Sequence, residues 1–281
     1  MNDSLYDKAK ALLWQEYHQS FDAVRQSAFH KAFVNEKIKH SFQVAGAGNG
    51  ILAHEAYFQG KSKEFTEIAK TAILLHDIYR FREVRGWLET GQKIDHSIEG
   101  AHFLKTKPDF DNILITLPVK HHGHMIERFF EDEEYLALDE QTKDEVKHIA
   151  FAVRDADKIA NWNLVCSNTF GAFREVWFPS PDDHSKAQGF VRGDLLEYFF
   201  ACKVSPIKIR QTNAEMIFSL MCWLFDMNYE YSILYCKRLK LFDAFCTILK
   251  EIQVDDSLIA RAKETMSDYV KNKFGLCIEK N

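Results

Sequence analysis

Apolar residues recur at spacings of three and four along most of this 281-residue chain. Such spacing gathers them on one side of an α-helix, whereas a period of two would indicate β-strands. Only 12 glycines and 5 prolines interrupt the pattern, so the sequence predicts an all-α fold. We expect helices over residues 5–30, 36–58, 62–79, 96–106, 110–122, 139–166, 211–228, 230–250 and 256–273.

Two long stretches, residues 80–95 and 178–194, lack this periodicity. Irregular stretches of such length within a domain tend to be functional, and we expect them to determine substrate specificity. The length of the chain suits one large domain or two small ones. We expect a helical metal-binding domain over residues 1–177 and a C-terminal helical extension over residues 178–281, packed on the same core.

The composition excludes several classes of partner. A formal net charge of -5 gives no electrostatic reason to expect nucleic acid. No apolar run approaches the roughly 18 residues of a membrane span, and the N-terminus lacks the basic-then-apolar layout of a signal peptide. The six cysteines are scattered without a CxxC pair, which favours reduced thiols. We therefore expect a cytoplasmic protein that contacts neither membrane nor nucleic acid.

The segment ILLHDIYRF, residues 73–81, places His76 and Asp77 at the end of an aliphatic run. A buried ionised carboxylate costs several kcal/mol unless something pairs with it. A metal ion would satisfy both side chains at once. With 3.6 residues per turn, the two side chains lie about 100° apart around the helix axis. Both therefore can point into one cavity from the end of the helix.

Two further apolar stripes carry an inward polar residue. His40 occupies the inward position of a stripe over residues 33–51, and Asp157 interrupts a stripe over residues 146–164. Asp155 lies roughly 200° from Asp157 around the helix and is expected to face elsewhere. A lone histidine on an apolar face is usually a hydrogen-bonded core residue. Two inward imidazoles and two inward carboxylates, however, form a ligand set that suits Mn²⁺, Fe²⁺, Mg²⁺, Co²⁺ or Zn²⁺.

More histidines lie between these positions. His96 opens the segment DHSIEGAHFL, where it is either a surface residue at a helix start or a further ligand. His121 and His122 stand in VKHHGH, which is either a polar helix end near the C-terminal dipole or part of a site. Leu117 shares a helix face with His121, and Pro118 shares the adjacent face with His122. At least one of the two histidines is therefore expected to face inward.

In chain order, His40, the HD pair at residues 76–77 and Asp157 resemble the signature of the HD superfamily of metal-dependent phosphohydrolases. The segments DHSIEGA and KHHGH resemble the further histidine motifs of members with more than one metal. This resemblance implies an HD-domain helical bundle with additional C-terminal helices. The ligands that it implies for a first metal are His40, His76, Asp77 and Asp157. Asp77 would bridge to a second metal, held by His96 and by His121 or His122.

The same resemblance implies an activity. We expect one or two divalent ions to activate a water molecule, which hydrolyses a phosphate ester or anhydride in a small molecule. We expect this small molecule to be a nucleotide. Arg80 and Lys158 are expected to contact the phosphate, and Asp77 to take part in catalysis. Many relatives have glycine where Tyr79 stands, so the end of the helix is bulkier here. The chain also lacks the GYP motif of the branch that acts on cyclic dinucleotides.

Two alternatives keep the site and change its role. Some HD-fold proteins with this motif order hold two irons and oxidise their substrates with O₂. A non-catalytic nucleotide-sensing module is the other alternative, motivated by the aromatic-rich C-terminal half, although aromatic stripes are more often core. We expect the C-terminal helices to complete the core, to cover the site or to form a homodimer contact.

The glycine-rich segment GAGNG, residues 46–50, is not a nucleotide-binding loop. It follows no predicted strand, and it lacks the lysine and hydroxyl of a P-loop. Glycine lowers helix propensity by about 1 kcal/mol per residue. We expect these small residues to be present because they let two helices pack closely.

Overall fold

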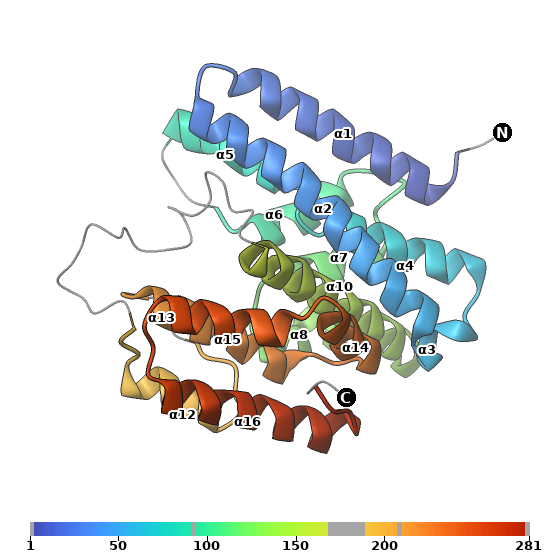
Figure 1. Ribbon diagram of the computed structural model, residues 1–281. Coiled ribbons are helices and arrows are strands. Elements are labelled where there is room, and N and C mark those ends of the chain that lie inside the picture. Colours follow the sequence, from blue (N-terminus) through green and yellow to red (C-terminus); the bar gives the residue numbers. More distant parts are fainter. Residues whose placement is uncertain (1–2, 91–93, 168–188, 207–209, 279–281) are drawn as a thin grey trace. The chain divides into compact units, whose positions relative to one another are not determined.

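Figure 1 shows the computed structural model, which describes residues 3–90, 94–167, 189–206 and 210–278. None of these residues forms a strand, so the predicted all-α fold is confirmed. By internal contacts the chain divides into two compact units, residues 1–160 and 161–281. The predicted domain boundary between residues 177 and 178 lies outside the described residues.

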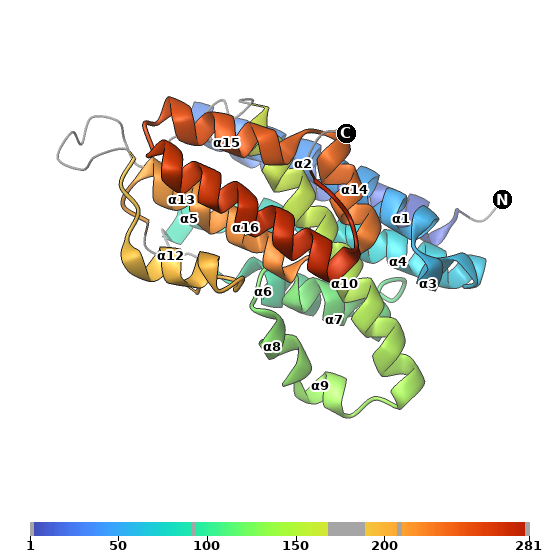
Figure 2. The same ribbon diagram turned by 60° about the horizontal axis from the view of Figure 1, so that its bottom comes forward.

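The first unit holds every residue that the sequence nominates for the site. It consists of α1 (Leu5–Ala23), α2 (Ala28–His54), α3 (Ala56–Gln59), α4 (Lys63–Leu75), α5 (Arg80–Thr90), α6 (His96–Lys105), α7 (Ile113–His121), α8 (Ile126–Phe130), α9 (Glu133–Leu136) and most of α10 (Glu140–Cys166). Helix α1 packs against α2, α4 and α5, and α4 also packs against α2 and α7. Helices α6 and α7 form another packed pair, and α8 and α9 lie on the connection from α7 to α10 (Figure 2).

The second unit has its own aromatic core. It contains α12 (Gly193–Phe200), α13 (Asn213–Met221), the 3₁₀ helix η2 (Cys222–Asp226), α14 (Glu230–Arg238), α15 (Leu241–Glu251) and α16 (Asp256–Phe274). Trp162 is fully buried, donates a hydrogen bond from Nε1 to the carbonyl of Leu220 (2.9 Å), and packs edge-on against Phe245. Four members of the C-terminal aromatic run belong to the core rather than to an exposed stripe: Phe225, Tyr229, Phe242 and Phe245.

Short polar side chains begin most helices of the first unit. The Ser27 hydroxyl accepts a hydrogen bond from the backbone N–H of His30 at the start of α2. Asp95 and Asn112 cap α6 and α7 in the same way. Each cap satisfies an amide that has no partner inside its helix, which stabilises the helix by about 1 kcal/mol. These caps therefore fix where the site-bearing helices start.

Several sequence-based boundaries were wrong, and three of them have a clear explanation in the structure. The helix expected over residues 5–30 ends at Ala23, because Ser27 caps a new helix. The helix expected over residues 230–250 is two helices, because Lys240 adopts a left-handed conformation (φ 58°) between them. The stretch at residues 80–95, expected to be irregular, contains α5 up to residue 90. Residues 91–93, and most of the stretch at residues 178–194, lie outside the described residues.

A hydrophobic cluster joins α7, α8 and α10. It is formed by Leu117, Phe129, Val146 and Ala150, with Ile113, Leu114, Ile126, Tyr135 and Leu138 packed around it. Burial of one aliphatic side chain stabilises a fold by about 1.5–3 kcal/mol. The cluster therefore attaches α7 to α10 independently of the polar residues at the end of α7.

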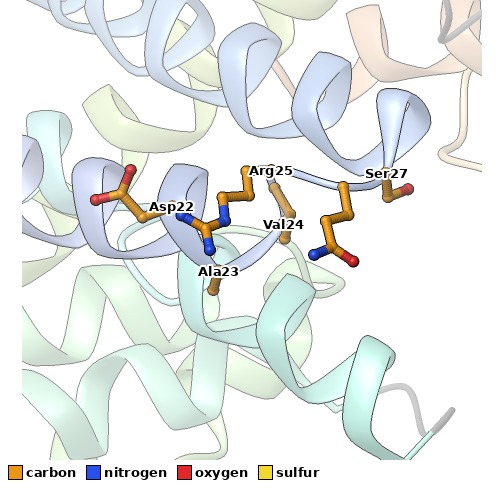
Figure 3. Close-up of a pocket in the computed structure, with 6 residues that line it drawn as sticks. Asp22, Ala23, Val24, Arg25 and Ser27 are labelled. Carbon is orange, nitrogen blue, oxygen red and sulfur yellow. The ribbon is translucent and has the colours of Figure 1, made fainter.

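Two hollows in the described part of the chain lie away from the predicted site residues. One, of about 490 Å³, is lined by residues 22–27 at the turn from α1 to α2 (Figure 3). The other, of about 560 Å³, lies in the second unit beside α16. None of the described helices is both long and apolar enough to cross a lipid bilayer. All six cysteines are free thiols, as their spacing predicted.

The glycines of residues 46–50 have different surroundings, and one of them permits close packing. A Cβ atom added to Gly48 would lie 2.7 Å from Cγ2 and 2.8 Å from Cδ1 of Ile73, on the neighbouring helix α4. A Cβ atom added to Gly46 would meet nothing within 4 Å. Close packing of α2 against α4 thus explains Gly48 but not Gly46.

These two glycines make a matched pair for mutation. Overpacking a core costs about 1–3 kcal/mol, which outweighs the gain of about 1 kcal/mol in helix propensity. We expect Gly48→Ala to lower the free energy of unfolding by about 1 kcal/mol and Gly46→Ala to raise it by about 0.5 kcal/mol. Urea denaturation measures both, and an equal gain in the two variants would contradict this account of the α2–α4 contact.

Candidate metal centre

The carboxylate of Asp77 lies at the middle of the site, and each of its oxygens faces different histidines. Asp77 is 3% exposed. Its Oδ2 lies 3.8 Å from Nε2 of His76 and 3.9 Å from Nε2 of His40. Its Oδ1 lies 3.2 Å from Nε2 of His96 and 3.3 Å from Nε2 of His122. One buried carboxylate thus separates two pairs of imidazole nitrogens.

The first group combines residues from three segments. His40 comes from the middle of α2, His76 and Asp77 from the turn between α4 and α5, and Asp157 from α10. Oδ1 of Asp157 lies 3.0 Å from Nε2 of His40 and 3.7 Å from Nε2 of His76. One ligand atom each of His40, His76 and Asp77 lies within 4.8 Å of the other two. This group can hold a metal ion.

The protonation of His76 tests whether a cation fits the first group. Its Nδ1 lies 2.9 Å from the carbonyl oxygen of Ile73. A carbonyl only accepts, so Nδ1 carries the proton and the neutral ring presents a lone pair at Nε2. That nitrogen is buried and has no hydrogen-bond partner among the described residues. It faces Asp77 and Asp157, which are acceptors too, and a cation among these atoms would satisfy all of them.

The second group contains a histidine held in the same way as His76. His122 donates a hydrogen bond from Nδ1 to the carbonyl of Val119 (2.8 Å), so its Nε2 lone pair also faces Asp77. Nε2 of His96 lies 3.3 Å from Nε2 of His122. His96 is the first residue of α6 and His122 follows the last residue of α7, and these helices pack together. Asp77, His96 and His122 form a second set able to hold a metal ion.

Two cationic side chains flank Asp77. Nζ of Lys37 lies 2.8 Å from Oδ2, and Nε of Arg80 lies 3.6 Å from Oδ1. Burial acts to raise the pKa of Asp77, but the charge of Lys37 and a hydrogen bond from His96 oppose burial, and this pKa lies well below its usual range. The guanidinium of Arg80 also donates to the buried Glu83 (2.7 Å). Asp77 is therefore ionised in the interior at neutral pH.

Burial has the opposite effect on the histidines. It lowers the pKa of His76 to about 4 and that of His96 to about 4, despite the neighbouring carboxylates. Both rings are therefore neutral at physiological pH. A neutral imidazole is the form that binds a metal ion.

The remaining predicted site residues have different positions. His121 turns away from Asp77 and bonds to Asp132 through Nε2 (2.7 Å), so His122 is the member of the pair that joins the cluster. Lys158 is buried on α10, next to Asp157. The choice of Asp157 over Asp155 as the interior carboxylate was wrong as to burial: Asp155 is fully buried, while the side chain of Asp157 is 20% exposed. Helix α10 is buried on several sides here, as residues 152–156 are all buried.

The other cations of the first long stretch have a structural role. Arg82 donates two hydrogen bonds to the buried carboxylate of Glu16 on α1 (3.0 and 2.8 Å), and Arg85 donates another to it (2.9 Å). These contacts attach α5 to α1. They also leave Arg80 as the arginine of α5 that lies beside Asp77.

Sequence reasoning missed three residues around the site. Lys37 lies in the same stripe as His40, one turn earlier, so its inward position could have been predicted from the spacing. Glu83 follows Arg80 at a spacing of three, which a helix over residues 80–90 would have revealed. Arg154 donates to backbone carbonyls at the end of α7. That contact joins two segments about 30 residues apart in the chain, so no local sequence pattern could reveal it.

Comparison with known proteins places the site within one family domain. Residues 38–162 match the family model of the HD domain. The matched range includes both histidine–aspartate groups and Asp157, while Lys37 lies one residue before it. No curated protein and no solved structure matches the chain.

Metal binding should depend on Asp77 and not on aspartates in general. A ligand that binds only the folded state stabilises it by about 2.7 kcal/mol at one hundred times its dissociation constant. We expect Mn²⁺ or Co²⁺ to raise the melting temperature of the wild type and to have little effect on Asp77→Asn. Asp132→Asn, which changes a histidine-bonded aspartate outside both groups, should respond like the wild type. Equal responses of the two variants would contradict this assignment.

The metal-free protein should also lose stability on acidification, at pH values above those at which carboxylates titrate. Between pH 6.5 and 4 the unfolded chain binds protons at His76 and His96 that the folded chain does not bind. The free energy of unfolding therefore falls as the pH is lowered through this range, by about 1.4 kcal/mol per pH unit for each histidine. Denaturation of the apoprotein over this range should show a slope that His76→Gln reduces by about that amount. An unchanged slope would mean that His76 is not buried in its neutral form.

Proposed function

Because this chain belongs to the HD superfamily, we propose that it is a metal-dependent phosphohydrolase acting on a small phosphorylated molecule. The observation that carries the proposal is the position of Asp77, whose two oxygens face separate pairs of imidazole nitrogens. A carboxylate in this position would hold two metal ions as a pair, and such a pair stabilises both the attacking and the leaving oxygen of a phosphoryl transfer.

Each group supplies the ligands of one divalent ion. His40, His76 and Asp157 would hold the first ion and His96 and His122 the second, with Asp77 shared. When bound, such ions lower the pKa of a coordinated water toward 7 and polarise a phosphoryl oxygen. The chain contributes orientation: Ile73 and Val119 fix the rings of His76 and His122 through their Nδ1 atoms.

The balance of charge favours an anionic substrate. Arg80 and Glu83 form an ion pair and cancel. With Lys158 reserved for the substrate, Asp77 and Asp157 then stand against Lys37, which leaves one net negative charge. Two divalent ions would turn this into three net positive charges in a buried site. A neutral substrate would leave that charge uncompensated, whereas a phosphate group would neutralise most of it.

Arg80 is the side chain that we assign to the substrate phosphate. Glu83 holds one of its nitrogens at 2.7 Å, while its Nε is buried without a hydrogen-bond partner among the described residues. A positioned guanidinium can bind phosphate oxygens with two parallel hydrogen bonds. Lys158 stays a second candidate for the same role, on the strength of its position beside Asp157.

An aromatic pair beside Lys37 supports a nucleotide as the substrate. The ring of Phe33 lies 6.0 Å from Nζ of Lys37 and packs edge-on against Trp87, with ring centroids 5.3 Å apart. The indole Nε1 of Trp87 is buried and has no acceptor among the described residues. A nucleobase has both a face for such rings and acceptors for such an N–H.

A hydrolysis screen, in which the products are separated by chromatography, tests the proposal. We expect protein loaded with Mn²⁺, Mg²⁺, Co²⁺ or Fe²⁺ to hydrolyse at least one member of a panel of phosphomonoesters, nucleotides and cyclic nucleotides. Asp77→Asn should reduce the rate by more than about 100-fold, the upper end of the loss caused by changing an outer-shell partner of a metal. Arg80→Lys should raise KM more than it lowers kcat, and Gly46→Ala should leave the rate unchanged. Metal-loaded protein that binds nucleotides and hydrolyses no member of the panel would contradict hydrolysis and favour a sensing role.

The nitrogen-rich ligand set favours one alternative, a di-iron oxygenase. Four imidazoles and two carboxylates suit iron as well as they suit the metals of hydrolases. Anaerobic purification with Fe²⁺, followed by measurement of O₂ consumption and electron paramagnetic resonance, separates the two reactions. Hydrolysis proceeds without O₂, whereas an oxygenase consumes O₂ in proportion to its product.

A further inference from the structure

A buried arginine connects the two metal groups. Arg154 is 4% exposed and lies on α10, three residues before Asp157 of the first group. Its NH1 atom donates hydrogen bonds to the carbonyls of His121 (2.8 Å), His122 (3.3 Å) and His124 (2.5 Å). One guanidinium thus holds the backbone on both sides of His122, a residue of the second group.

These carbonyls need such a partner because they lie at the end of α7. The last carbonyls of a helix have no amide partner within the helix and carry partial negative charge. The ring of His122 is itself attached to the backbone of α7, through its bond to the Val119 carbonyl. The position of Nε2 of His122 therefore follows the backbone that Arg154 holds.

The same turn also reaches the other histidine of the second group. Nε2 of His124 bonds to Oδ2 of Asp95 (2.9 Å). Oδ1 of Asp95 accepts hydrogen bonds from the backbone amides of Ser97 and Ile98 and so caps α6. His96 follows Asp95 directly. The contacts run without interruption from Arg154 through the turn at residues 121–124 to the helix that carries His96.

We infer that Arg154 is a positioning residue that sets the place of the second metal group relative to the first. We call Arg154, the turn at residues 121–124 and Asp95 the strut. Helix α10 supplies Asp157 to the first group and, about 4.5 Å along its axis, anchors the strut that supports the second. The inference rests on the proposed pair of metal ions.

The strut is distinct from general packing of α7 on α10. The hydrophobic cluster of Leu117, Phe129, Val146 and Ala150 already holds α7 against α10 without Arg154. Loss of the guanidinium therefore leaves α7 attached and releases only its last turn. The first group, formed by α2, the turn after α4 and Asp157, keeps its contacts.

Arg154→Lys is the test, because a lysine keeps the charge but cannot present the planar fork of a guanidinium to several carbonyls. Full-length wild type and variant are titrated with Mn²⁺ alone, and bound metal is counted by mass spectrometry and followed by electron paramagnetic resonance. We expect the wild type to bind two ions and the variant to bind the second ion about 10–100-fold more weakly. The signal of an exchange-coupled Mn²⁺ pair should give way to that of isolated Mn²⁺, with the affinity for the first ion unchanged.

Arg82→Lys is the matched control. It also removes a guanidinium that makes several hydrogen bonds, but its partner is Glu16, outside the site. This variant should bind two ions with the affinities of the wild type. An equal weakening of the second ion in Arg82→Lys would show that the effect is general loosening of the unit, and it would overturn the inference.

The outcomes separate the strut from the proposed function. If the wild type binds fewer than two ions, the metal pair and the strut both fail. If Arg154→Lys binds two ions as tightly as the wild type, or loses both together while folded, the strut is wrong and the metal pair stands. Should Arg154→Lys not fold, Asp95→Ser decides, because serine keeps the helix cap and removes the oxygen that binds His124. Weakened binding of its second ion supports the strut, and two ions at wild-type affinity overturn it.

Discussion

A single buried carboxylate, that of Asp77, is the group around which the first unit is organised. An ionised carboxylate inside a protein is strongly destabilising unless its surroundings compensate for the water that it has lost. Lys37 makes one direct contact with it, and imidazole nitrogens surround both of its oxygens. The fold brings these partners from helices that are far apart in sequence. The packing of α2, α4, α6, α7 and α10 is what makes this arrangement possible.

Two of the histidines around Asp77 are held in one tautomer by the backbone. The backbone carbonyls of Ile73 and Val119 fix the proton of His76 and of His122 on Nδ1, so both rings present lone pairs toward a carboxylate. Acceptors that face acceptors in a dry interior are unfavourable in the absence of a cation. The same feature that weakens the apoprotein therefore prepares the site for metal, and links the stability of this unit to its chemistry.

Local periodicity was enough to predict the helices, the inward position of His40 and the place of the HD pair, because each depends on residues within a few turns. It could not choose between His121 and His122, which are adjacent on a helix end. That choice is made by Asp132, which lies beyond α7 and captures His121, and by Arg154 from α10. Helix α5 escaped prediction for a related reason, since its arginines are satisfied by a buried carboxylate on α1. Contacts between distant segments leave no periodic trace.

The most direct test of the shared carboxylate is a crystal structure of the protein grown with Mn²⁺, with anomalous scattering used to locate the ions. The account predicts two anomalous peaks on opposite sides of Asp77. One should lie among His40, His76 and Asp157, and the other between His96 and His122, with one Asp77 oxygen bound to each. A map without a peak at Asp77, or with His76 Nε2 turned away from the metal, would contradict the account.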